Sequence, residues 1–329
     1  MKTRKIGESG LVTGVLSMGA WAIGGGSWWG ENDDSQSIRT IHSALEQGLN
    51  WIDTAPVYGF GHSEEVVGRA LKDRRERAVL STKCGLQWRN ELGSHPFTKD
   101  GHSVYRNLSA QSIRKDLEDS LQRLQTDYID IYYTHWQAAE DGASIAETME
   151  ELLKMKQEGK IRVIGASNVT TEHLDEYLKY GKVDVIQEKF SLLDRRVEAS
   201  LLPYCEEHKI TLQAYSPLEQ GLLTGKITMD YKIEPGSVHE NKFWWMPEHR
   251  QYAIEMLNGW RDLTLKYGCS LGNLAIAWMV ARSEYLNVLG GARTIEQAQE
   301  NAKAGELQLE KADFERMTRD ADRAIESAN

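Results

Sequence analysis

Residues 109–135 read SAQSIRKDLEDSLQRLQTDYIDIYYTH, and this stretch holds one helical pattern followed by one strand pattern. Four apolar residues recur at helical spacing and predict an amphipathic helix over 109–124: Ile113, Leu117, Leu121 and Leu124. After a short break, residues 128–134 form a run of aromatic and β-branched side chains that is typical of a buried strand. A helix joined by a short connection to a buried strand is the building unit of a parallel sheet.

The same alternation repeats along the chain. Further strands are predicted at 15–18, 49–52, 79–82, 161–166, 183–186, 211–214 and 286–289. Helical patterns lie between or after them at 63–71, 145–157, 170–180, 197–208, 271–281 and 295–304. Eight strands that alternate with helices favour an α/β fold of the closed (β/α)8 TIM-barrel type over an open doubly wound sheet.

Three segments fall outside the repeating units. Residues 3–6 and 11–14 predict an N-terminal β-hairpin, 230–250 form a long insertion after the seventh strand, and 313–327 predict a C-terminal helix. No linker, repeat or low-complexity segment divides the chain, so we expect residues 1–329 to form a single domain.

Composition narrows the class of protein. The net charge is 39 − 49 = −10, which argues against a nucleic-acid partner because phosphates attract a basic face. No apolar run reaches the length of a signal peptide core or a membrane helix, so no membrane partner is expected. Cys84, Cys205 and Cys269 are far apart and lack metal-ligand spacing, which predicts reduced thiols, no metal and a cytoplasmic protein. No G-x-G-x-x-G follows the first strand, which argues against a Rossmann cofactor site.

Ionisable residues stand where three consecutive predicted strands end. They are Asp53, Lys83 and His135, and the strand ends of a barrel all meet at one rim. Tyr58 lies in the loop after Asp53. The Lys83 ammonium is expected to lower the pKa of Tyr58 from about 10 and make it a proton donor and acceptor near neutral pH. Asp53 would keep Lys83 protonated, and His135 would donate a hydrogen bond to a carbonyl oxygen.

Over nearly its whole length the sequence resembles the aldo-keto reductase superfamily, and within it the bacterial branch related to general stress proteins and inositol-locus reductases. The segments that carry the resemblance are Gly19-Ala20-Trp21, Asp53-Thr54-Ala55-Pro56-Val57-Tyr58, Ser81-Thr82-Lys83, Thr134-His135-Trp136, Gly165-Ala166-Ser167-Asn168, Tyr215-Ser216-Pro217-Leu218 and Gly291-Ala292-Arg293-Thr294. The resemblance implies a catalytic tetrad of Asp53, Tyr58, Lys83 and His135. It also implies hydride transfer between NADP(H) and a small carbonyl or alcohol, with sugar-derived compounds among the candidates, and with Tyr58 as general acid in reduction and general base in oxidation.

The same resemblance implies a cofactor site. Its expected residues are Ser167, Asn168 and Gln187 at the carboxamide, Tyr215 under the nicotinamide ring, Ser216, Pro217, Leu218, Gly221 and Lys226 at the pyrophosphate, Gly291, Arg293, Gln297, Glu300 and Asn301 at the adenosine half, and Trp21 and Asp53 beside them. Many relatives carry an arginine where Gln297 stands, so Arg293 is left to bind a 2′-phosphate. We therefore expect NADP(H), with NAD(H) as the alternative.

Aromatic residues supply the candidate substrate contacts. These are Trp21, Trp28, Trp29, Tyr58, His135, Trp136, Trp244 and Trp245. The tryptophans of 21–29 either form a substrate wall or pack beneath a loop. Two other functions stay open: a cofactor-binding regulatory subunit with little turnover, and a Schiff-base aldolase with Lys83 as nucleophile. Asp53 argues against the aldolase because it would keep Lys83 protonated.

Overall fold

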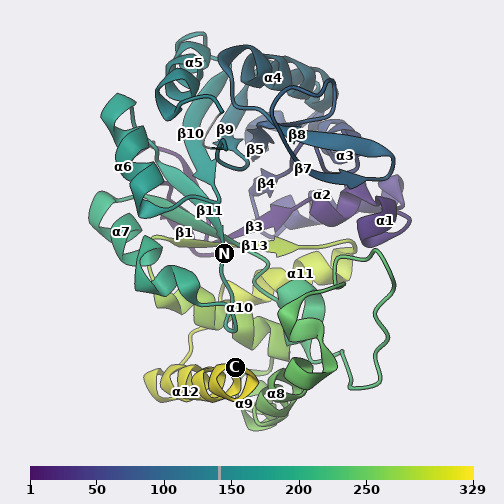
Figure 1. Ribbon diagram of the computed structural model, residues 1–329. Coiled ribbons are helices and arrows are strands. Elements are labelled where there is room, and N and C mark those ends of the chain that lie inside the picture. Colours follow the sequence, from purple (N-terminus) through teal and green to yellow (C-terminus); the bar gives the residue numbers. More distant parts are fainter. Residues whose placement is uncertain (140–141) are drawn as a thin grey trace.

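The computed structural model describes residues 1–139 and 142–329. Eight parallel strands close into a barrel, as predicted (Figure 1): β3 (Leu16–Gly19), β4 (Trp51–Asp53), β5 (Val79–Cys84), β9 (Ile129–Thr134), β10 (Ile161–Ser167), β11 (Val185–Lys189), β12 (Thr211–Tyr215) and β13 (Leu286–Gly291). The closure is the pairing of the last strand with the first, in which Val288 lies opposite Leu16.

A ring of helices surrounds the barrel. It consists of α2 (Asp34–Glu46), α3 (His62–Leu71), α4 (Ala110–Leu124), α5 (Ile145–Gln157), α6 (Thr171–Tyr180), α7 (Leu201–His208), α10 (Leu271–Arg282) and α11 (Ile295–Ala304). Polar N-caps begin several of them; the Ser144 side chain, for example, accepts the Glu147 N–H at the start of α5. The helix predicted over 197–208 is divided, because Ser200 leaves the helical region at φ −144° and ψ −60°.

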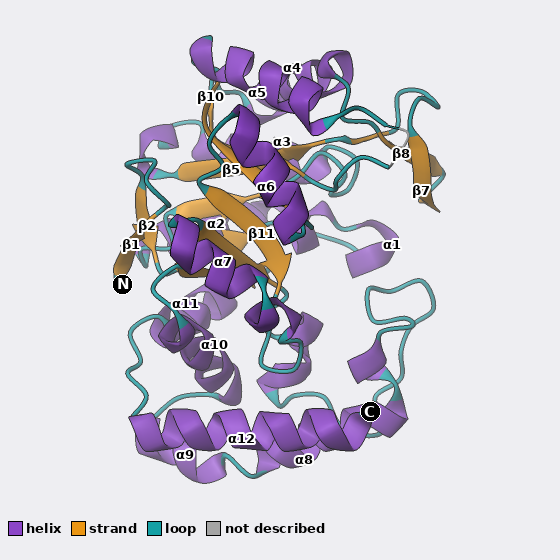
Figure 2. Ribbon diagram, turned by 60° about the vertical axis from the view of Figure 1, so that its left-hand side comes forward, coloured by secondary structure: helices purple, strands orange, loops and turns teal. Residues whose placement is uncertain are grey.

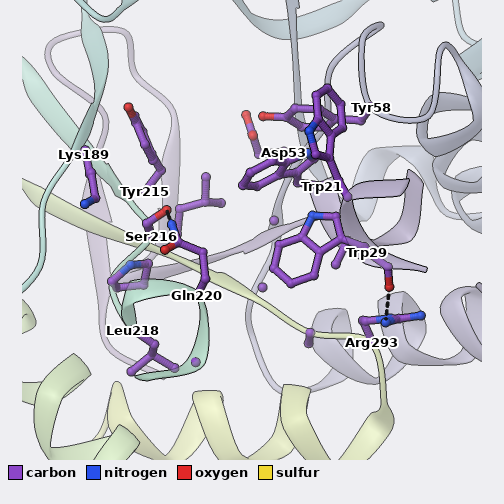
Figure 3. A pocket seen from close by; sticks show the side chains of 18 of the residues that line it. Trp21, Trp29, Asp53, Tyr58, Lys189, Tyr215, Ser216, Leu218, Gln220 and Arg293 are labelled. Carbon is purple, nitrogen blue, oxygen red and sulfur yellow. Dashed lines mark hydrogen bonds between the residues drawn. The ribbon is translucent and has the colours of Figure 1, made fainter. Parts of the chain in front are cut away.

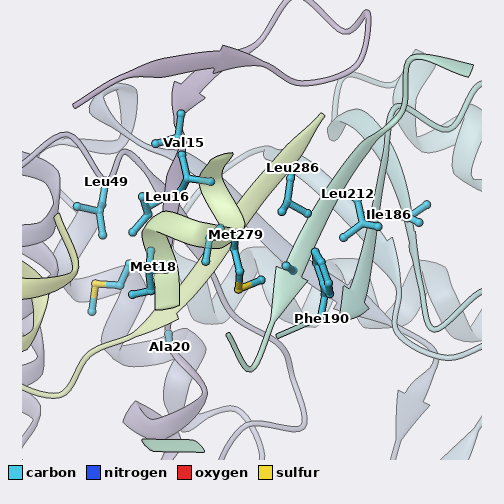
Figure 4. Close-up of a cluster of buried hydrophobic side chains, with 14 of the residues drawn as sticks. Val15, Leu16, Met18, Ala20, Leu49, Ile186, Phe190, Leu212, Met279 and Leu286 are labelled. Carbon is cyan, nitrogen blue, oxygen red and sulfur yellow. The ribbon is translucent and has the colours of Figure 1, made fainter. Parts of the chain in front are cut away.

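Alternation along each strand sorts the side chains into two clusters. The first, inside the barrel, contains Ile6, Trp51, Val79, Ile131, Tyr133, Val163 and Val185. The second lies between strands and helices, and Figure 4 shows part of it, with Leu16, Met18, Leu212 and Leu286 from the strands and Met279 from α10. Successive side chains of a strand point to opposite faces. Trp51, Val79 and Tyr133 point into the barrel. Asp53, Lys83 and His135 lie on the same inward face of these strands, at their ends.

Small sheets lie at the two ends of the barrel (Figure 2). The predicted N-terminal hairpin pairs β1 (Thr3–Lys5) with β2 (Val12–Gly14), and Ile6, which is 1 % exposed, enters the interior cluster from it. A three-stranded sheet that the sequence reading missed follows β5: β6 (Leu86–Gln87), β7 (Ser94–Lys99) and β8 (His102–Arg106). The β7–β8 turn places Asp100 at φ 48° and Gly101 at φ 78°, the left-handed conformation that suits a two-residue hairpin turn.

The predicted insertion and C-terminal helix are both present. After β12 the chain runs through two short 3-10 helices, Glu219–Thr224 and Phe243–Trp245, to α8 (Pro247–Asn258) and α9 (Arg261–Tyr267). The insertion therefore ends earlier than predicted, at Pro247, where α8 begins. The last helix, α12 (Lys311–Ala328), packs along α8 and covers Trp278, whose indole donates to Thr318 Oγ1 at 2.9 Å. No helix in the described parts of the chain is long and apolar enough to cross a membrane.

Candidate active site

A cavity of about 700 Å³ opens where the barrel strands end. Figure 3 shows its two walls, with Lys189, Tyr215 and Ser216 on one side and Trp21, Tyr58 and Trp29 on the other. Three residues of the predicted tetrad, Asp53, Tyr58 and His135, line it directly.

Lys83 lies behind this lining, paired with Asp53. Its Nζ donates to Asp53 Oδ2 at 2.7 Å and to the Thr54 carbonyl oxygen at 2.8 Å, and neither charged side chain is more than 1 % exposed. The second carboxylate oxygen of Asp53 accepts from Ser81 Oγ at 2.7 Å and from Gln187 Nε2 at 3.1 Å. The buried carboxylate thus has donors on both oxygens, which is the condition under which a buried ion pair is tolerated.

Tyr58 and His135 stand against this ion pair. The Lys83 ammonium lies 5.0 Å from the centre of the Tyr58 ring, and the Tyr58 and His135 rings are 5.9 Å apart at 86°. Burial and the Lys83 charge lower the pKa of His135 well below its usual value, so the imidazole is neutral. A neutral imidazole keeps one N–H with which to donate a hydrogen bond.

The pKa of Tyr58 is raised, whereas the sequence predicted that Lys83 would lower it. Burial, and then the Asp53 carboxylate, raise the pKa of the Tyr58 phenol well above its usual value. The physical reason lies in the ion pair: the phenol lies beside a lysine whose charge is balanced by a carboxylate at 2.7 Å, so burial dominates. The phenol of Tyr58 is therefore protonated at neutral pH.

The residues expected at the carboxamide come together beside His135. Asn168 Nδ2 donates to the His135 carbonyl oxygen at 2.8 Å and to Ser167 Oγ at 3.1 Å, and the Tyr215 hydroxyl donates to Asn168 Oδ1 at 3.0 Å. Asn168 takes the left-handed backbone conformation, at φ 56°, that directs its side chain into this arrangement. Gln187 also lines the cavity, and together these residues offer amide and hydroxyl groups to a ligand.

The loop after β12 has an unusual backbone. Ser216, Glu219, Gln220 and Gly221 all have positive φ, and a side chain added at Gly221 would meet open space. A turn of this kind points successive backbone N–H groups into one concavity that suits an anion. Lys226, at the end of the loop, also lines the cavity. Pro217 and Leu218 complete this part of the lining.

Two buried polar atoms of the cavity lining are available to bind a ligand. Trp29 Nε1 and Gln220 Oε1 have no hydrogen-bond partner among the described residues. Trp29 Nε1 is a donor and Gln220 Oε1 is an acceptor, so hydroxyl groups of a ligand satisfy both, whereas a phosphate oxygen can only accept from the indole. The cavity then continues to the start of α11, where Gly291, Arg293, Gln297, Glu300 and Asn301 line it.

Aromatic side chains form the wall near Tyr58. Trp21, Trp28, Trp29 and Trp136 all line the cavity, so the first of the two interpretations of the 21–29 loop fits its position. Phe97, on the hairpin that the sequence reading missed, adds to this wall and packs edge-on to Trp28 at 5.9 Å. The Asp100-Gly101 pair was the sequence signal that could have revealed this hairpin.

Trp244 and Trp245 do not reach the cavity. Both are buried; Trp245 stacks on His239 at 3.6 Å and donates its indole N–H to the Glu219 carbonyl oxygen at 3.0 Å. Sequence alone does not separate a tryptophan that supports a loop from one that faces a ligand. Neither tryptophan is therefore placed to contact a substrate in this cavity, contrary to the prediction.

In the described part of the chain no cluster of three or more His, Cys, Asp or Glu side chains could hold a metal ion. The three cysteines are free, and Cys84 faces away from Lys83 and the cavity into the outer core cluster.

Known proteins with a similar sequence or structure include several oxidoreductases. A family model described as Aldo/keto reductase family matches residues 15–321. A protein of Escherichia coli (strain K12) named NADH-specific methylglyoxal reductase is 47 % identical over 317 residues, which cover 95 % of this chain and 96 % of the relative. A solved glycerol dehydrogenase from Gluconobacter oxydans superposes with a TM-score of 0.88 at 34 % identity and covers 98 % of this chain and 96 % of its own. An aldo-keto reductase from Klebsiella pneumoniae, solved in complex with NADPH, has a TM-score of 0.72 at 26 % identity, with 97 % and 94 % covered.

Proposed function

Because this chain belongs to the aldo/keto reductase family, we propose that it reduces a small aldehyde or ketone to the alcohol with a nicotinamide dinucleotide. The observation that carries this proposal is the buried Lys83–Asp53 pair held against Tyr58 and His135 at the mouth of the barrel. A structural ion pair needs no phenol and imidazole converging beside it at the edge of a cavity.

The donor set of the cavity fits such a cofactor. Amide and hydroxyl groups of Ser167, Asn168 and Gln187 suit a carboxamide, and the Tyr215 ring offers a face to a flat heterocycle. The curled 216–221 backbone and Lys226 suit a pyrophosphate. When bound, the nicotinamide supplies or accepts the hydride.

The residues of the tetrad position the carbonyl oxygen and supply the proton that it accepts. His135, neutral because of burial, donates a hydrogen bond to the carbonyl oxygen and fixes its position. Tyr58, protonated because of burial, gives its phenol proton to the same oxygen as the alcohol forms. The Lys83 ammonium, 5.0 Å from the ring centre, stabilises the phenolate that remains, and Asp53 holds that ammonium in place.

The substrate proposed here is a small carbonyl compound. The Escherichia coli relative acts, by its name, on methylglyoxal, and the Gluconobacter oxydans neighbour is a glycerol dehydrogenase, so both names point to three-carbon compounds. The apolar wall of Trp21, Trp28 and Trp136 suits the non-reacting end of such a molecule. The three free cysteines suit a reducing compartment, and we place the enzyme in the cytoplasm.

The choice of dinucleotide depends on α11. The Escherichia coli relative is named NADH-specific, whereas the Klebsiella pneumoniae structure holds NADPH. Use of NADP(H), as expected from the sequence, depends on Arg293, since position 297 carries a neutral glutamine. NAD(H) is the alternative, and the contacts that Arg293 makes bear on the choice between the two dinucleotides.

The test is the substitution Tyr58→Phe. We expect reduction of methylglyoxal, followed by the loss of NADH or NADPH absorbance, to fall by about 10²–10⁴-fold while dinucleotide binding persists. Tyr180→Phe, at an exposed tyrosine of α6, is the matched control and should keep the wild-type rate. A wild-type rate in the Tyr58 variant refutes the mechanism.

The two other functions predict different experimental results. A regulatory subunit would bind dinucleotide tightly and turn over no carbonyl substrate. An aldolase would be trapped covalently on Lys83 by borohydride.

A further inference from the structure

Arg293 makes a contact that a ligand-binding arginine does not need. Its Nη1 donates to the Trp29 carbonyl oxygen at 3.0 Å, and its Nη2 donates to the Glu31 carbonyl oxygen. Figure 3 shows the first of these bonds, with Arg293 directly beneath Trp29 on the same side of the cavity. Arg293 lies just before α11, whereas Trp29 and Glu31 belong to the loop that leads from β3 to α2. The guanidinium therefore joins two segments that are 262 residues or more apart in sequence.

The loop that Arg293 holds is also fixed along its other side. The Ser27 N–H donates to Asp100 Oδ2 at 3.1 Å, on the β7–β8 turn, and the Trp28 carbonyl oxygen accepts from the Val238 N–H at 3.3 Å. Trp28 and Trp29 of this loop line the cavity. The loop thus spans the mouth of the cavity, from the hairpin on one side to α11 on the other.

The position of α11 along the cavity indicates which part of the dinucleotide lies next to it. Tyr58 and His135 mark the end where the reacting ring must lie, and the 216–221 backbone offers the anion cradle. The end lined by Arg293, Gln297 and Glu300 is what remains for the adenosine half of the dinucleotide.

We propose that Arg293 is a clasp that closes the 21–32 loop over the adenosine end of the bound dinucleotide, and that this role selects NAD(H) over NADP(H). The inference rests on the proposed function, because it assigns the cofactor of the same site. Arg293 acts by holding the loop, and a 2′-phosphate is disfavoured because a guanidinium that turns toward it gives up the two carbonyl oxygens that it holds.

The geometry of the guanidinium gives the reason. A bidentate phosphate contact uses two parallel N–H groups of one edge, and Arg293 already directs Nη1 and Nη2 at two carbonyl oxygens. Its backbone N–H donates to Gln297 Oε1 at 2.7 Å, so the neutral amide that replaces a second cation is turned toward Arg293 itself. Glu300, in the same wall, adds a carboxylate that repels a phosphate.

The other cations of the described lining are placed elsewhere. Lys189 is paired with Asp194 at 3.1 Å and with Glu219 at 3.0 Å. Lys226 and Lys242 both lie on the segment after β12, which forms the other wall. A 2′-phosphate at α11 would therefore have to take Arg293 from the loop, whereas a ribose hydroxyl leaves the clasp intact.

Binding measurements on Arg293→Gln separate the clasp from a phosphate ligand. NADH and NADPH are titrated against the protein, and binding is followed by quenching of its tryptophan fluorescence. For the wild type we expect NADH to bind more tightly than NADPH. For Arg293→Gln we expect the Kd for NADH to rise about tenfold, because two hydrogen bonds that hold the loop are lost.

A phosphate-binding arginine predicts the reverse. In that case Arg293→Gln leaves the NADH affinity within twofold of the wild type and weakens NADPH alone, and this result overturns the proposal. Arg293→Lys sharpens the comparison, since a lysine keeps the charge but cannot span two carbonyl oxygens. The clasp predicts that Arg293→Lys also loses NADH affinity.

A second readout needs no cofactor. Backbone hydrogen exchange of residues 24–32 should be faster in Arg293→Gln than in the wild type, and unchanged in Lys303→Gln, an exposed control on α11. Equal exchange in all three proteins overturns the clasp. Tyr58→Phe should bind both dinucleotides like the wild type, so a failure of the proposed chemistry is distinguishable from a failure of the clasp.

Discussion

Lys83 brings a positive charge to a position where its side chain has no exposure to solvent, and Asp53 is what makes this possible. Neither partner can move freely, because each makes further hydrogen bonds. Lys83 donates to the Thr54 carbonyl oxygen, and Asp53 accepts from Ser81 and Gln187. Stability and chemistry are therefore coupled at this one contact.

Removal of both charges should separate stability from turnover, whereas removal of one should damage both. Lys83→Met leaves Asp53 buried and unpaired, and we expect the free energy of unfolding to fall by about 3–5 kcal/mol, as measured by urea denaturation. The double variant Asp53→Asn, Lys83→Met removes both charges and should recover part of that loss without recovering turnover. If the double variant is as unstable as the single one, the pair is not the source of the loss.

The raised pKa of Tyr58 sets the pH dependence of the two directions. Reduction needs the protonated phenol, whose population is lost only as pH rises through the raised pKa, so its rate should stay level up to pH of about 9. Oxidation needs the phenolate and should rise about tenfold per pH unit below that pKa. His135, with its lowered pKa, stays neutral throughout this range. Initial rates measured in both directions test this; a reductive rate that falls near neutral pH contradicts it.

At the scale of elements, the strands were predictable and the β7–β8 hairpin was not. The barrel strands are buried on both faces, so their apolar runs are visible in the sequence, and the ionisable residues at their ends stand out against that background. The hairpin mixes histidine, threonine, lysine and serine, and its apolar face consists mainly of Phe97 and Val104, which is too short to give a detectable pattern. Its contribution to the site depends on Phe97 reaching Trp28, a contact between segments far apart in the chain.

The hairpin should influence substrate binding without influencing the chemistry. Phe97→Ala opens the wall opposite Trp28, and we expect KM to rise several-fold for carbonyl substrates with an aryl group and little for methylglyoxal, with kcat nearly unchanged for both. Steady-state kinetics on methylglyoxal and phenylglyoxal give the comparison. Thr98→Ala, at an exposed position of the same strand, is the control. An equal loss of kcat with both substrates would place Phe97 in the catalytic arrangement instead.

At the scale of the whole molecule, the site and the C-terminal helix lie on different sides of α10. Met317 of α12 is fully buried, and Trp278 of α10 stacks on Phe314 with ring centres 5.7 Å apart. The helix covers the barrel's outer layer and contributes no residue to the described cavity lining.

Damage to α12 should therefore lower stability and leave catalysis intact. We expect Met317→Ala to lower the free energy of unfolding by about 2–5 kcal/mol, measured by urea denaturation, while the folded enzyme keeps its kcat and KM. The exposed neighbour Arg319 provides the control variant Arg319→Ala. A changed KM in folded Met317→Ala would reveal a connection between α12 and the cavity.

The N-terminal hairpin gives the barrel a floor. Ile6 plugs the interior from below, and the Gly7 and Glu8 backbone N–H groups donate to Thr211 and Asp184 at the starts of neighbouring strands. Together with the side chains of the interior cluster, Ile6 fills the barrel from this end. Reactant, product and dinucleotide must therefore enter and leave at the opposite end, where the strands finish and the cavity lies.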